Sequence, residues 1–237
     1  MEKSGFDEAL QRLVKELQAA LGERLCGLVL YGAATSPDFQ PGQERARVML
    51  VLSTADAGTL MDARGPLEQA RRAAGVMPYI LRQGELARLA DAFPVRVRSM
   101  KAHHRVLCGG DPFEEVSVKP ADLRLRLEQE LRNRLLRLRA AYVNTAEHLP
   151  SLRQQVLQQS RGLWMDLEAI LSLRGVDVSE GSPREIRERY AQEYAGAAAG
   201  LAALEQAESG PLENASAVDS ILKLYESLVE TVDGLAP

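Results

Sequence analysis

Aromatic side chains are scarce in this chain of 237 residues: they make up 5% of it, with a single Trp. Leu, Val and Ala must therefore build the core, and a hydrophobic fraction of 46% is enough for a folded protein. The two cysteines, Cys26 and Cys108, are too few for a disulfide framework and are expected to be buried thiols. There is no signal-peptide core and no run of about 20 apolar residues, which predicts a soluble, cytoplasmic protein with no membrane partner.

The net charge is also small, at −4, and favours neither nucleic acid nor an anionic membrane. Only the stretch 121–139 is locally basic, with six Arg against three acidic residues. Arg124, Arg132 and Arg139 lie near one face of an expected helix, with Glu128 between the first two. A salt-bridge ladder at i,i+4 spacing explains these arginines better than contact with RNA does, so we expect no nucleic-acid partner.

The apolar pattern changes near Pro120 and divides the chain there. Before this point, five segments are expected to be strands: 25–31, 47–53, 76–81, 95–98 and 104–107. Three segments are expected to be helices: 4–22, with Ser4 as its N-cap, 56–74, capped by Asp56 or Thr59, and 84–91. This order predicts an α+β domain over residues 1–118, in which helices pack on a small mixed sheet.

After Pro120 the apolar spacing is helical almost to the end of the chain. Five helices are expected: 121–142, 150–171, one opened by the capping box of Ser182 and Glu185, an Ala-rich one over 191–207, and 215–232. The connections between them are short. The pattern predicts an all-α helical bundle domain over residues 119–237.

The stretch from Cys26 to Leu52 has the strongest functional signal. A buried strand, a turn at Gly32 and a loop lead to a second strand, and such a unit can bind a phosphate on the backbone N–H groups after the turn. Chemistry with Mg²⁺ would need carboxylates where the second strand begins. Arg45 and Arg47 stand there instead, and arginine repels a divalent cation but binds phosphate or carboxylate directly.

These residues resemble those of the DNA polymerase β-like nucleotidyltransferase superfamily, specifically its small bacterial members with a helical C-terminal domain. In that family a strand ends in Gly-Ser, and Asp-x-Asp or Asp-x-Asn begins the next strand. Here Leu30-Tyr31-Gly32 fits the strand end, Ala33 replaces the serine, and Arg45 and Arg47 fall on the two acidic positions. The segment 93–101 matches the one that supplies the family's third acid, but it has no carboxylate.

The segment 104–113 and the helix from Leu123 to Tyr142 are also similar to this family. The resemblance implies a nucleotidyltransferase-like fold, and the substitutions imply a site that has lost its catalytic acids. It further implies that the segment 93–101 is a strand next to the one that follows Arg47. Arg96 and Arg98 would then share a face with the first arginine pair.

The predicted ligand site therefore consists of six residues: Gly32, Ala33, Arg45, Arg47, Arg96 and Arg98. No catalytic residue, metal ligand or cofactor is predicted. The arginines would hold a nucleotide, another phosphate-bearing ligand or an acidic group of a protein partner. The simpler alternative is that they lie along the solvent-exposed surface, or pair with Glu44 and Asp91.

Three functions remain open at this level. The first is a degenerate, inactive transferase that binds a phosphate-bearing ligand or a protein. The second is an active, metal-dependent nucleotidyltransferase whose acids come from Asp38, Glu44 or Asp56. The third is a structural or regulatory subunit, in which the helical domain binds a partner or forms a homo-oligomer.

Overall fold

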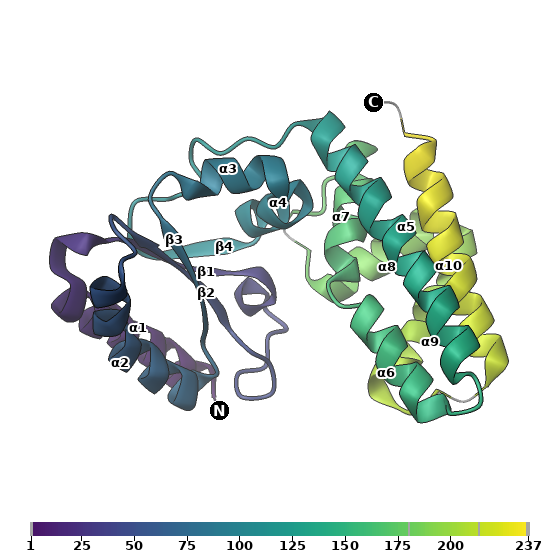
Figure 1. Cartoon of the computed structure of the whole chain (residues 1–237), viewed down its shortest axis with the longest axis horizontal. Coiled ribbons are helices and arrows are strands. Elements are labelled where there is room, and N and C mark those ends of the chain that lie inside the picture. The colour runs from purple at the N-terminus through teal and green to yellow at the C-terminus, as the bar shows by residue number, and fades with distance from the viewer. Residues whose placement is uncertain (1, 180, 213, 236–237) are drawn as a thin grey trace. The chain divides into compact units, whose positions relative to one another are not determined.

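The computed structural model describes residues 2–179, 181–212 and 214–235 (Figure 1). The chain divides into two compact units, Met1–Val118 and Lys119–Pro237. The first combines a mixed sheet with helices, and the second is helical throughout its regular elements. The predicted α+β class, with an all-α part after it, is confirmed. None of the helices in the described ranges is both long and apolar enough to span a membrane.

Four strands form the sheet of the first unit, in the order β3-β2-β1-β4. They are β1 (Leu25–Tyr31), β2 (Arg47–Leu52), β3 (Met77–Arg82) and β4 (His104–Gly109). β1 pairs antiparallel with β2 and β4, whereas β3 runs parallel to β2. The start of β2 therefore lies beside the end of β1, and Arg47 is in register with Tyr31.

The edge strand β3 contains a proline at its second position. The N–H of Met77 donates to the carbonyl of Ala46 at 2.7 Å, toward β2. Successive backbone nitrogens alternate in direction along a strand, so the nitrogen of Pro78 faces the open edge. A proline at this position removes no hydrogen bond from the sheet.

Each face of the sheet is covered by two helices (Figure 1). The helices α1 (Lys3–Leu21) and α2 (Ala57–Ala74) pack on the face that presents residues such as Leu28 and Leu50. The helices α3 (Glu85–Ala92) and α4 (Pro94–Ala102) pack on the face that presents residues such as Val29 and Met49. Covering both faces buries five residues in each central strand, which explains their apolar runs.

Residues 94–102 form the helix α4, so the prediction of a strand over 95–98 is wrong. Pro94 occupies the first turn of this helix, where its missing N–H removes no hydrogen bond. Val95 and Val97 are both buried, and four alternating residues are too few to distinguish a period of 2 from a period of 3.6. The helical geometry also turns Arg96 and Arg98 about 200° apart, so these two side chains do not share a face.

The second unit contains six α-helices within the described residues: α5 (Pro120–Thr145), α6 (Leu149–Gln159), α7 (Leu163–Leu173), α8 (Pro183–Glu193), α9 (Ala198–Ser209) and α10 (Ala215–Asp233). The prediction of five is wrong because the expected helix 150–171 is interrupted. Gly162 lies in the interruption with a φ of 73°, a left-handed conformation that stops the regular helix before α7 begins. The Ala-rich segment also divides, since a 3-10 turn, Ala195–Ala197, precedes α9.

The predicted helix caps have mixed outcomes. Ser182 and Glu185 form the capping box of α8, and Asp56 caps α2 by accepting from the N–H of Thr59 at 2.9 Å. Both predictions are confirmed. Ser4 does not cap α1, because the helix already begins at Lys3 and Ser4 lies within its first turn.

The salt-bridge ladder predicted for three arginines of α5 forms at Arg124 and Arg132, and the prediction is wrong for Arg139. Glu128 lies 3.7 Å from Arg124 and 3.2 Å from Arg132, one turn away on either side. Arg139 pairs instead with Glu226 of α10, at 2.6 Å. These arginines therefore stabilise the packing of the helical unit rather than forming a free basic surface.

A buried ion pair joins α5 and α7. The Asp166 side chain is 1% exposed and lies 2.5 Å from the guanidinium of Arg134, which is 17% exposed. A second carboxylate, Glu130, lies 3.8 Å from the same guanidinium. Burial raises the pKa of Asp166 to about 7, although the charge of Arg134 opposes this shift. A carboxyl group in these surroundings makes the stability of the unit sensitive to pH.

We expect the titration of Asp166 to lower the stability of the chain as the pH rises from about 4 to about 7. The folded state keeps a proton on Asp166 up to about pH 7, whereas the unfolded chain releases it near the ordinary pKa of 3.8. In this window the folded state binds the extra proton, so raising the pH destabilises it. Urea midpoints measured across this range should fall more steeply for the native chain than for Asp166→Asn. Parallel curves for the two proteins would contradict the expectation.

Candidate functional site

The turn after β1 and the beginning of β2 meet at one end of the sheet. β1 ends at Tyr31 and is followed by a 3-10 turn, Gly32–Thr35. The antiparallel pairing of β1 with β2 places Arg47, the first residue of β2, directly beside Tyr31. Backbone pairing thus brings together two segments of the predicted ligand site that are separated by a long loop.

Two arginines act on the Tyr31 side chain from different elements. Burial raises the pKa of Tyr31, and the positive charges of Arg47 and Arg96 lower it in part. Arg47 comes from β2 and Arg96 from α4, which crosses the same face of the sheet. Tyr79 of β3 also raises the pKa of Tyr31 and packs against the same core. Two guanidinium groups and a second phenol therefore lie close enough to Tyr31 to act on its hydroxyl group.

Arg45, Arg47 and Arg96 are exposed, and none of them forms an ion pair with a carboxylate in the part of the chain that the structure describes. Glu44, a suggested partner, instead accepts from the backbone N–H of Gln40 at 3.2 Å. Cations that gather without a protein partner create a positive potential, which attracts an anion. This arrangement favours an anionic ligand over an internal salt bridge.

The other predicted site residues have different surroundings. Gly32 and Ala33 are half-buried, and the N–H of Gly32 donates to the carbonyl of His103 at 2.8 Å, so it is not free for a ligand. Arg45 lies in the loop before β2, not in the strand. Arg98 is half-buried and points away from Arg96 around α4. The structure thus places Arg47 and Arg96 each near Tyr31, whereas Arg98 turns away from Arg96 around α4.

The metal ion that the family resemblance implies does not fit these residues. Mg²⁺ requires oxygen ligands, and guanidinium groups occupy the position where they would be. Across the described ranges, no group of three or more His, Cys, Asp or Glu side chains could hold a metal ion. Among the suggested replacement acids, Asp56 caps α2 beyond the far end of β2, and Asp38 is exposed in the loop after the turn.

A nearby cavity of about 390 Å³ is less suited to an anion. It lies beside the turn on the α1 side, and its lining includes Lys3 and Arg105. Both cations are engaged: Lys3 donates to the carbonyl of Pro37, and Arg105 pairs with Asp7 at 3.0 Å. An anion entering this cavity would have to compete with these existing contacts.

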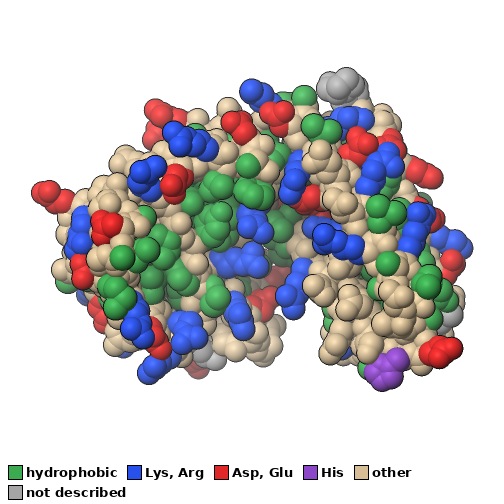
Figure 2. Space-filling model, in the orientation of Figure 1, with side chains coloured by type: hydrophobic (Ala, Val, Ile, Leu, Met, Phe, Trp, Pro, Cys, Tyr) green, Lys and Arg blue, Asp and Glu red, His purple; other side chains and the backbone are tan. Residues whose placement is uncertain are grey.

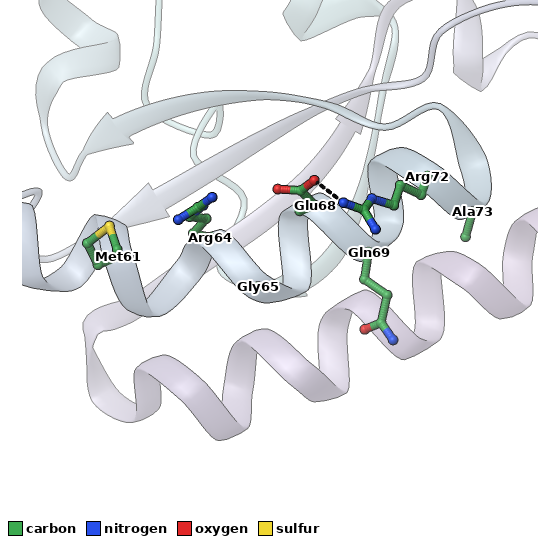
Figure 3. A pocket seen from close by; sticks show the side chains of 7 residues that line it. All are labelled: Met61, Arg64, Gly65, Glu68, Gln69, Arg72 and Ala73. Carbon is green, nitrogen blue, oxygen red and sulfur yellow. Dashed lines mark hydrogen bonds and ion pairs between the residues drawn. The ribbon is translucent and has the colours of Figure 1, made fainter.

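A depression of about 720 Å³ lies on the outer surface of α2 (Figure 3). Its lining comes from this single helix, from Met61 to Ala73, and Glu68 within it pairs with Arg72 at 2.7 Å. Ligand sites usually bring together polar groups from several elements. This surface does not, so the arginine pair beside Tyr31 remains the better candidate.

Sequence reasoning did not single out Tyr31 or Tyr79 as site residues. The available signal was the pairing of the two strands, because residues directly opposite each other in an antiparallel pair share a face, and Tyr31 lies opposite Arg47. A buried tyrosine keeps a polar end that needs a partner, so its position next to an arginine is informative. The approach of Arg96, by contrast, depends on the path of α4 over the sheet.

No family model matches this chain, and no curated protein is similar to it in sequence. One similar solved structure is the crystal structure of spectinomycin adenyltransferase AAD(9) from Enterococcus faecialis with ATP and spectinomycin. The two chains are 12% identical, with a TM-score of 0.46. The alignment covers 96% of this chain and 99% of the adenyltransferase.

Proposed function

We propose that the first unit is a nucleotidyltransferase-like domain without catalytic activity, which binds a phosphate-bearing ligand on Arg47 and Arg96. The main support is the approach of these two unpaired guanidinium groups to Tyr31 from separate elements. The ligand class includes nucleotides, whose phosphates match the bidentate geometry of arginine. The ligand binds without a metal ion, because arginines stand at the positions where carboxylates would hold one.

The expected affinity is modest. A hydrogen bond to a charged group contributes about 1.5–3 kcal/mol. Two such arginines, after the costs of association, correspond to dissociation constants of roughly micromolar to millimolar. Both side chains are exposed, so salt should weaken the binding.

Calorimetric titration with ATP and with pyrophosphate, in the presence of EDTA, tests this function. Both ligands should bind the native chain without metal, and Arg47→Gln with Arg96→Gln should weaken them at least about tenfold. Arg12→Gln removes an exposed arginine from α1, away from the site, and should have no effect. Equal binding by the native chain and the double variant would contradict the proposal.

A second pair of substitutions separates this function from that of an active enzyme. Arg45→Asp with Arg47→Asp should abolish ligand binding and leave the fold intact, because both side chains are exposed. These added acids should not create transferase activity, since Ala33 and the missing third acid remain. ATP binding by the native chain that requires Mn²⁺ or Mg²⁺ would support the active nucleotidyltransferase instead.

A further inference from the structure

Another cavity of the first unit lies on the sheet face that α3 and α4 cover, at the end away from Arg47. It is located between α3 and the segment that follows β4. Its volume is about 520 Å³, within the range of small-molecule sites. Its lining includes four buried apolar side chains: Val51, Leu81, Leu86 and Val116. Cys26 also lines it, with its sulfur 3.6 Å from the side-chain oxygen of Gln83. The cavity is therefore a preformed site with an apolar floor.

The rim of this cavity is acidic. Asp111, Glu114 and Glu115 line it, against the single cation Arg82. Figure 2 shows acidic side chains interspersed with Lys and Arg along this part of the first unit, over α3 and the chain that leaves β4. Such a rim makes the potential at the entrance negative.

The individual contacts leave part of this charge uncompensated. The guanidinium of Arg82 lies 3.8 Å from the carboxylate of Glu85, which is not part of the cavity lining. The carboxylate of Asp111 lies 3.3 Å from the imidazole of His104. Glu114 and Glu115 are exposed, and neither pairs with a cation in the ranges that the structure describes. These two carboxylates are therefore available to a positively charged ligand.

We propose that this cavity is a binding site for a small organic cation, an amine or amidine attached to an apolar body. The apolar body would cover the apolar surface that the cavity floor still exposes to water, which is favourable in proportion to the area covered. The cationic group would lie at the rim, facing Glu114 and Glu115. The same carboxylates repel an anion, and a fully polar cation would leave the floor exposed to water. The site shares no residue with the arginine pair beside Tyr31.

Benzamidine is a suitable probe, because it joins a cation to an aromatic ring. Benzamide is its neutral counterpart and benzoate its anionic one. In a Cys108→Ala background Cys26 is the only thiol, so its alkylation by iodoacetamide reports whether the cavity is filled. We expect benzamidine to slow the alkylation in a saturable way, benzamide to do so more weakly, and benzoate to have no effect.

Variants of the rim and of the cavity wall complete the test. Glu114→Gln with Glu115→Gln should weaken protection by benzamidine roughly threefold to tenfold. Glu8→Gln with Glu23→Gln removes two exposed carboxylates outside the cavity and should change nothing. Ala87→Trp should fill the cavity and abolish protection without altering charge, because Ala87 is exposed and lines it.

Three results would overturn the proposal. One is equal protection by benzamidine and benzamide, another is identical behaviour of the two double variants, and the third is undiminished protection in Ala87→Trp. Circular dichroism of each variant shows whether it is folded. None of these measurements involves the phosphate ligand, so the two sites stand or fall separately.

Discussion

Arg134→Met should destabilise the chain by about 3–5 kcal/mol, measured by urea unfolding at about pH 8. Asp166 is almost fully buried, and Arg134 is the cation that lies against it. Removing the guanidinium leaves a buried carboxylate whose only charged neighbour in the described part of this cluster, Glu130, is also negative. The ionised form of Asp166 then has no compensation for the hydration that it lost on folding.

Two controls make this expectation specific. Arg134→Met combined with Asp166→Leu removes both charges together and should recover most of the lost stability, because an apolar pair can replace a buried ion pair. Arg137→Met alters an exposed arginine on the same helix and should stay within about 0.5 kcal/mol of the native chain. If Arg134→Met alone is as stable as the native chain, the ion pair of Arg134 and Asp166 does not hold α5 and α7 together.

Gly200→Ala should cost about 2 kcal/mol or more, even though alanine favours helices by about 1 kcal/mol over glycine. Gly200 of α9 faces α10 at very short range. A methyl group added there would lie 2.5 Å from the Leu224 Cβ and 2.6 Å from the carbonyl oxygen of Ser220. The carbonyl belongs to the backbone of α10 and cannot rotate away, so the two helices would have to separate.

Gly196→Ala is the matched control in the same segment. An added Cβ at Gly196 meets no atom within 4 Å, and its backbone has an ordinary φ. This variant should be as stable as the native chain or slightly more so, because alanine restricts the unfolded state. If both glycine variants unfold at the same urea concentration, that result contradicts the close contact described between α9 and α10.

The elements that the sequence predicted well are those with a clear local cause. β1 and β2 are continuous apolar runs, and the capping box at Ser182 fixes the start of α8 through contacts within one turn. The helix α4 was missed because Val95 and Val97 face the core in either conformation, helix or strand, over so short a segment. The interruption before α7 was missed because glycine is tolerated inside helices as well as at their ends.

The candidate site was predictable only in part, for a different reason. Arg47 lies beside Tyr31 through strand pairing, which the order of strands and loop implies. Arg96 was selected as a member of a strand, yet it approaches Tyr31 from a helix. Its approach depends on how α4 crosses the sheet, and that path is decided by tertiary packing rather than by the spacing of residues within the segment.

Pro78 in β3 should lower the tendency of this chain to aggregate. The free edge of a sheet can pair with a strand from another molecule, and this pairing begins aggregation. Because the nitrogen of Pro78 faces that edge, an incoming strand meets a missing hydrogen-bond donor and the bulk of a ring where a continuous ladder would have to form. Pro78 thus protects the outer side of the sheet from intermolecular strand pairing, at a position where the internal hydrogen bonds of the sheet lose nothing.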